Sequence, residues 1–251
     1  MRDAWLLAVG TLTALRVGHP AAVDRRIAGR AMVLAPLAVV PLGALVGLIG
    51  WAGRELELAP LAVAAIAVLA LALGSRALHL DGLSDVADAL TASYDRERSL
   101  EVMKGGTSGP AGSAALVLVL GVQVAALASV LSLPRGPVLA AVLVCASRAI
   151  LSVTCAHGVP AARGNGLATT YAGTVARPLA VLTWVIVAAI CAGVTDWAGI
   201  DWWRGLAIAV AGVAVGVALT WRCVRRFGGV TGDVFGASIE VTLAAMLVAA
   251  S

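Results

Sequence analysis

The feature that most constrains this chain is a series of apolar runs, each of about the length that a bilayer-spanning helix needs. Seven such runs occur, at residues 31–51, 59–78, 111–133, 137–156, 178–195, 205–221 and 235–250, of which the last two are short. Hydrophobic residues make up 61% of the 251 residues and charged residues 13%, too apolar a balance for a soluble core of this size. The sequence therefore predicts an all-α, polytopic membrane helical bundle with about six to seven transmembrane helices. No repeat or linker divides the chain, so we expect one integral-membrane domain over residues 1–251.

Basic residues divide unequally between the two faces that these spans define. Alternating the spans places the N-terminal tail and the loops 80–110, 158–177 and 222–234 on one face. That face carries thirteen basic residues: Arg2, Arg16, Arg25, Arg26, Arg30, Arg96, Arg98, Lys104, Arg163, Arg177, Arg222, Arg225 and Arg226. The other face has three, Arg54, Arg135 and Arg204. The positive-inside rule makes the first face cytoplasmic and predicts a multi-pass protein of the inner cell membrane.

We accordingly attribute the formal net charge of +4 to the topology and to attraction to anionic lipid, and not to a nucleic-acid site. No surface combining basic and aromatic residues, as nucleic acid requires, is visible. Residues 5–15 are apolar but too short to span, and they predict an interfacial helix in preference to a signal peptide. The four cysteines show no C-x-x-C spacing and are interpreted as small buried apolar residues.

The segment HLDGLSDVADAL, residues 79–90, places Asp81, Asp85 and Asp88 at the end of an apolar run. On a helix these carboxylates point at about 0°, 40° and 340°, and Asp95 would lie near them if the helix continued. Such a cluster is costly to desolvate unless it binds a cation, and carboxylate oxygens suit magnesium or manganese. The alternative is a solvated loop in which the aspartates cap the next helix and Gly82 makes a turn.

Further polar residues fall on the same face. The candidates for substrate binding are His79, Arg96, Lys104, Arg148, Arg163, Asn165, Thr231 and Asp233. The run GGTSGPAG after Lys104 can bring backbone N–H groups to an anion, although it lacks the P-loop order.

Each of these candidates also has a purely structural interpretation. His79 could simply lie at the interface, ion pairs could explain the charged segment around Arg96, and Asp233 could cap the last helix. Arg148 falls inside a span, where a charge is expensive and usually functional unless it snorkels. Glu240 could pair with Arg148 or with another buried group. The collective placement on one face favours a site.

With these residues in place, the chain resembles the cobalamin synthase family, the adenosylcobinamide-GDP ribazoletransferases, over nearly its whole length. The resemblance is carried by HLDGLSDVADAL at 79–90, DRERSLEVMK at 95–104, the ARGNGL loop and GGVTGD at 228–233. Three positions depart from the family pattern. Gly105 follows Lys104 where an acidic residue is common, Ala89 replaces a glycine, and the N-terminal segment matches only loosely.

The resemblance implies that adenosylcobinamide-GDP and α-ribazole, or its 5′-phosphate, are joined to give adenosylcobalamin, or its 5′-phosphate, and GMP. We expect Mg²⁺ on Asp81, Asp85 and Asp88, one of which, or Asp95, assists deprotonation of an attacking 5′-hydroxyl. Arginine and lysine side chains would hold the anionic oxygens. The partners expected are these small-molecule substrates and the lipid bilayer.

Two other functions remain open at this point. A CDP-alcohol phosphotransferase of lipid synthesis also uses aspartates near membrane helices, but its D-G-x-x-A-R order is absent here. A cation or corrinoid transporter would place charges near mid-membrane on several helices, ideally in two related halves.

Overall fold

The protein is built from helices. The computed structural model describes residues 1–251 and contains no strand, only two isolated β-bridges, Ala156–Val175 and Ala161–Val230. The helices are α1 (Arg2–Leu12), α2 (Arg25–Ala38), α3 (Val40–Glu55), α4 (Pro60–Gly74), α5 (Leu78–Ala92), α6 (Arg96–Val102), α7 (Pro110–Leu131), α8 (Gly136–Ser147), α9 (Ile150–Thr154), α10 (Leu167–Tyr171), α11 (Arg177–Trp197), α12 (Trp202–Phe227) and α13 (Gly232–Ala250).

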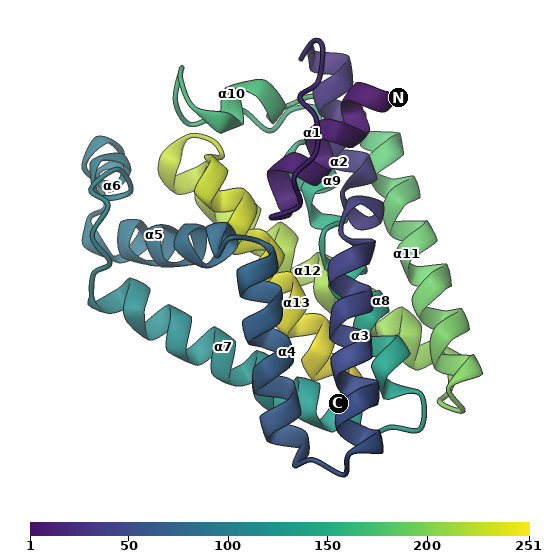
Figure 1. Cartoon of the computed structure of the whole chain (residues 1–251). Helices are drawn as coiled ribbons and strands as arrows, with labels where there is room; N and C mark the ends of the chain where they lie inside the picture. Colours follow the sequence, from purple (N-terminus) through teal and green to yellow (C-terminus); the bar gives the residue numbers. More distant parts are fainter.

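Six helical segments are long and apolar enough to cross a membrane (Figure 1). They are α2 with α3, α7, α8 with α9, α11, α12 and α13. The predicted all-α bundle with about six to seven transmembrane helices is therefore confirmed. The two spans that are short in the sequence are longer in the structure, because α12 has 26 residues and α13 has 19.

Helix α13 forms the centre of the bundle. It packs against α5, α7, α8 and α12, and 72% of its apolar window is buried inside the protein. The corresponding fraction is only 28% for α7 and 33% for α11 and α12, which leaves their outer faces to lipid. The N-terminus of this central helix, at Gly232, lies beside α5.

The predicted span at 59–78 ends early. Helix α4 has 15 residues, a rise of about 22 Å, which is less than the hydrocarbon core of about 30 Å. The chain then turns by 91° into α5, so that α4 and α5 make at most one bent span (Figure 1). Arg76 and Ala77 make the turn in the left-handed region, with φ of 58° and 54°. Arg76 holds it by donating to the Gly10 carbonyl at 2.8 Å.

The loops gather at two opposite ends of the bundle. At one end Arg96 donates to the Ala162 carbonyl at 3.0 Å, and Arg226 lies over the ring of Tyr94. At the other end Arg54 donates to the carbonyls of Leu133 and Pro134, and Arg135 lies 4.0 Å from the centre of the Trp197 ring. This grouping agrees with the division into two faces, while the cytoplasmic assignment stays a prediction.

The N-terminal apolar stretch forms α1, which packs on α2 and buries Ala4, Ala8 and Leu12. Its position at a membrane interface stays a prediction. Of the cysteines, Cys155, Cys191 and Cys223 are buried and Cys145 is half-buried, and all four are free thiols. The prediction of small buried residues is therefore confirmed for three of the four, and Cys145 is only partly buried.

Candidate active site

Helix α5 carries the aspartates across the bundle, outside the six spanning segments. Asp81 is exposed, Asp85 is half-buried and Asp88 is buried. The helix ends at Ala92, and Asp95 instead caps α6, where its Oδ1 accepts from the Arg98 amide at 2.8 Å. Asp95 therefore lies outside α5 and does not share a helix face with Asp81, Asp85 and Asp88.

Two glycines bring α5 close to the N-terminus of α13. A Cβ on Gly82 would lie 2.6 Å from the carbonyl oxygen of Asp233, and one on Gly236 would lie 2.9 Å from the Cα of His79. Gly82 is thus a helix-packing residue, not the turn residue that its place after Asp81 suggested. This close approach puts the aspartates of α5 beside Asp233.

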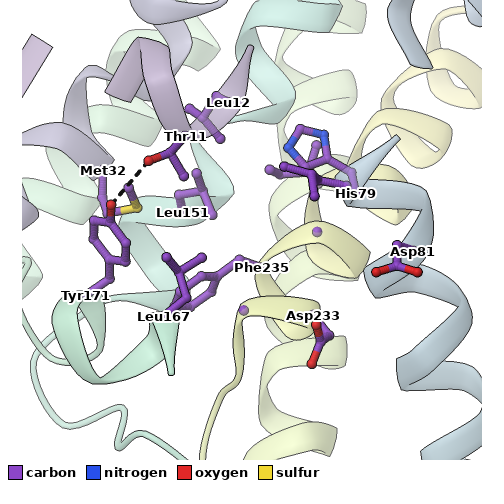
Figure 2. A pocket seen from close by; sticks show the side chains of 14 residues that line it. Thr11, Leu12, Met32, His79, Asp81, Leu151, Leu167, Tyr171, Asp233 and Phe235 are labelled. Atoms are coloured by element: carbon purple, nitrogen blue, oxygen red, sulfur yellow. Dashed lines mark hydrogen bonds between the residues drawn. The ribbon is translucent and has the colours of Figure 1, made fainter. Parts of the chain in front are cut away.

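A cavity of about 200 Å³ opens between α5, α13 and the helices around them (Figure 2). Asp81 and Asp233 lie on one side of it, and Met32, Leu151 and Tyr171 lie on the opposite side. A second, more polar hollow of about 180 Å³ contains Arg163, Asn165, Thr231 and Asp233. Asp233 therefore belongs to both spaces.

The carboxylates affect one another electrically. Partial burial, followed by the charges of Asp81, Asp233 and Asp88, raises the pKa of Asp85 to about 6, against a lowering by Arg163. Such mutual repulsion favours a cation at the same place.

No three His, Cys, Asp or Glu side chains converge closely enough to hold a metal ion by themselves. Magnesium, however, is commonly bound by one or two protein carboxylates, with phosphate oxygens and water completing the shell. Asp81 and Asp85 stand one turn apart on α5, and carboxylate oxygens are among the ligands that magnesium prefers. This pair matches the one or two carboxylates that Mg²⁺ takes from a protein, and its binding here stays a prediction.

Asp88 has a different environment from its two neighbours. Its Oδ2 accepts from the amide of Gly109 at 2.6 Å, and its Oδ1 accepts from the amide of Gly112 at 2.8 Å. These N–H groups belong to the glycine-rich run and to the first turn of α7, so the anion that they approach here is Asp88. The carboxylate caps α7, and its role as a metal ligand stays a prediction.

The basic candidates connect the loops around the hollow. Arg96 donates to the Ala162 carbonyl, as described above. Arg163 donates to the Leu100 carbonyl, and its Nε has no partner. Lys104 and Asn165 are exposed. Thr231 caps α13 by accepting from the Val234 amide at 3.3 Å, and its hydroxyl lies 3.1 Å from Asp233 Oδ2, to which it donates.

Arg148 and Glu240 lie deeper, among buried groups. The Oε1 of Glu240 is 3.6 Å from Nδ1 of His79, and its Oε2 accepts from Gln123 at 2.8 Å. Arg148 is fully buried and donates to the Val144 carbonyl and the Ser147 hydroxyl. The structure thus pairs Glu240 with His79 and Gln123, and Arg148 lines neither cavity.

Sequence patterns missed the apolar wall of the first cavity. It includes Leu12, Met32, Leu151, Tyr171, Phe235 and Ile239, drawn from five helices far apart in the chain. Aliphatic and aromatic residues are common in every span, so their type carried no signal. Only the tertiary contacts bring them to one place.

The chain is similar to known proteins over nearly its whole length. A family model described as cobalamin-5-phosphate synthase matches residues 4–251. A protein of Nocardioides sp. named adenosylcobinamide-GDP ribazoletransferase is 54% identical over 249 residues, which cover 99% of this chain and 98% of the relative. Proteins of the same name from Frankia casuarinae and Pseudomonas paraeruginosa are 39% and 37% identical, covering 94% and 99% of this chain and 90% and 99% of their own lengths. No solved structure matches.

Proposed function

This chain belongs to the cobalamin-5-phosphate synthase family, and on that premise we propose that it is an adenosylcobinamide-GDP ribazoletransferase of cobalamin synthesis. Its substrates are adenosylcobinamide-GDP and α-ribazole, or the 5′-phosphate of α-ribazole. The products are adenosylcobalamin, or its 5′-phosphate, and GMP. The observation that carries the proposal is the full-length family match together with the carboxylates that meet between α5 and α13.

The bond changes follow from these substrates. A hydroxyl oxygen of the ribose bonds to the phosphorus nearer the corrinoid, the bond from that phosphorus to the bridging oxygen breaks, and GMP leaves with the electron pair. The hydroxyl proton passes to a base. An acceptor that already carries a 5′-phosphate cannot attack through its 5′-oxygen, so we replace the expected 5′-hydroxyl with a secondary hydroxyl of the ribose.

Asp81 and Asp85 would hold Mg²⁺ against the diphosphate. The bound ion would supply positive charge to the oxygens that become more negative as the bond to GMP breaks. Asp88, in turn, fixes the start of α7 against α5 and so keeps the aspartate-bearing helix in place.

Asp233 is our candidate base. It lies on the cavity wall opposite the apolar residues, and the hydroxyl of Thr231 orients it with a hydrogen bond. Arg163 and Asn165 share the second hollow with it, where they would bind phosphate oxygens of the donor. The Nε of Arg163 is buried and has no hydrogen-bond partner.

The reaction is tested by GMP release from purified protein reconstituted in lipid, with adenosylcobinamide-GDP and α-ribazole, with and without magnesium. We expect GMP and adenosylcobalamin in equal amounts, only with magnesium. Asp85→Asn should abolish both, whereas Asp196→Asn, an exposed aspartate of α11, should retain them. Full activity of Asp85→Asn in folded protein would contradict the metal site.

The roles of the other two carboxylates separate in a magnesium titration. Asp81→Asn should raise the magnesium concentration needed for half-maximal rate. Asp233→Asn should lower kcat at every magnesium concentration without moving that midpoint. The opposite pattern would exchange the two assignments.

We also propose that the active site faces the cytoplasm of the inner cell membrane. The thirteen basic residues of the N-terminal tail and of the segments 80–110, 158–177 and 222–234 support this orientation. In a cysteine-free background, Asn165→Cys should react with a membrane-impermeant thiol reagent only in inverted vesicles, and Glu57→Cys only in intact cells. The reverse result would refute the orientation.

A further inference from the structure

The first cavity has an apolar part that neither the metal nor the phosphates use. Eight of its 14 lining residues are hydrophobic. Two of them, Tyr171 and Phe235, pack edge to face with ring centres 6.3 Å apart. The Tyr171 hydroxyl lies 3.2 Å from the hydroxyl of Thr11, so one of the two donates to the other and one O–H of the pair is left. The wall opposite Asp81 and Asp233 is therefore mainly apolar.

We propose that this cavity binds the base of the nucleoside acceptor, a flat, bicyclic and largely apolar heteroaromatic ring. The inference rests on the proposed function, because α-ribazole is a nucleoside whose base is a dimethylated benzimidazole. At about 200 Å³ the cavity is smaller than typical pockets for whole drug-sized ligands, so it suits one ring system and excludes a corrinoid.

The competing occupant is the guanine of the donor. Guanine carries hydrogen-bonding groups along one edge, and burying them without partners is costly. The polar lining residues Asp81, Asp233 and His79 gather on one side of the cavity, and the remainder of the wall offers apolar contact (Figure 2). A benzimidazole base, with few polar atoms, meets no such penalty there.

The position of the aspartates also sets the direction of the acceptor. Asp81 and Asp233 lie across the cavity from Tyr171 (Figure 2). With the base against Tyr171 and Phe235, the attached ribose would extend toward these carboxylates. Its hydroxyl then reaches the carboxylates where the donor diphosphate is bound. The cavity thus orients the nucleophile as well as binding the base, which is an efficient way to lower a bimolecular barrier.

Leu167→Trp tests the site by filling it. Leu167 lines the cavity, is 50% exposed and lies on the short α10, so a larger ring can enter the cavity from the surface. We expect the KM for α-ribazole to rise by about tenfold or more, equivalent to about 1.4 kcal/mol. The KM for adenosylcobinamide-GDP should rise by less, because Leu167 also lines the edge of the second hollow. Leu182→Trp is the control, since Leu182 is 51% exposed on α11 and lines no part of this cavity.

Base preference gives a readout that general damage would not move. The wild-type protein should prefer the dimethylated base over unsubstituted benzimidazole riboside, because the two methyl groups bury further apolar surface. Leu167→Trp should reverse or abolish that preference. If this variant does not fold, Phe235→Leu takes its place and should weaken both nucleosides, since it removes one of the aromatic walls.

Equilibrium binding of radiolabelled α-ribazole to the reconstituted protein, without donor, separates this inference from the proposed function. If the wild type binds α-ribazole but has no transferase activity, and Leu167→Trp loses that binding, the cavity assignment is supported and the proposed function is overturned. Transferase activity in the wild type, with an unchanged α-ribazole KM and a raised donor KM in Leu167→Trp, would overturn the cavity assignment alone. Absence of both binding and turnover in the wild type would overturn both.

Discussion

Replacing Asp88 should separate the structural from the chemical role of the aspartate cluster. Its two carboxylate oxygens accept from the amides of Gly109 and Gly112, and the side chain is only 8% exposed. Asp88→Ala removes both acceptors and the cap of α7, at a cost of about 2–4 kcal/mol of unfolding free energy. Asp88→Asn retains one acceptor oxygen and turns an NH₂ group toward the other amide, so about half of that cost is expected.

The assay is thermal unfolding of the detergent-solubilised protein, followed by tryptophan fluorescence and compared with activity at a temperature where all variants are folded. Asp85→Asn is the matched control, because Asp85 lies on the same helix and no hydrogen bond contributes to the shift of its pKa. It should lose activity while unfolding near the wild-type temperature. The expected order of unfolding temperature is wild type and Asp85→Asn, then Asp88→Asn, then Asp88→Ala.

One outcome would refute this reasoning. If Asp88→Ala unfolds at the wild-type temperature and yet has no activity, the two backbone hydrogen bonds contribute nothing to stability. Asp88 would then act in the chemistry, as a ligand of the metal, as the sequence pattern predicts. The capping geometry would be a feature of the protein without substrate.

Two further substitutions test the packing around the site. Gly82→Ala should lower kcat by about tenfold or more, because its Cβ would lie 2.6 Å from the carbonyl oxygen of Asp233 and force α5 away from α13. Gly121→Ala is the control, because a Cβ there meets open space. Equal rates in the two variants would contradict the close approach. Glu240→Ala should lower the unfolding free energy by about 1–3 kcal/mol, because it leaves the buried amide of Gln123 without its side-chain acceptor. If Glu240→Ala and Glu240→Gln unfold at the same temperature, that hydrogen bond does not contribute.

Much of the fold follows from hydropathy, because a bilayer imposes one length on every segment that crosses it. The apolar runs located the long helices, and their ends fell within six residues of the predicted bounds. The break after α4 was not predictable in this way. Arg76 and Ala77 are not residues that usually signal a left-handed turn, and the apolar run continues past them to Leu78.

The candidate site was predictable in its polar half. The spacing of Asp81, Asp85 and Asp88 indicated one helix face, and the structure adds Asp233, which the sequence had placed among the substrate-binding residues. What spacing alone could not separate was Asp88 from its neighbours, since its distinct role depends on Gly109 and Gly112 folding back over α5. Asp88 thus caps a helix, as the alternative predicted, but from a buried position inside α5 and not from a solvated loop. Its role as a metal ligand stays a prediction.

The walls of the first cavity come from both ends of the chain, from Thr11 on α1 to Ile239 on α13. During synthesis, the residues of the amino-terminal wall leave the ribosome long before those of the carboxy-terminal wall. The acceptor cavity can therefore close only after the last helix has entered the bilayer and docked beside α5. A chain that terminates before α13 has helices in the membrane but no enclosed place for a substrate, so complete translation is a condition for binding.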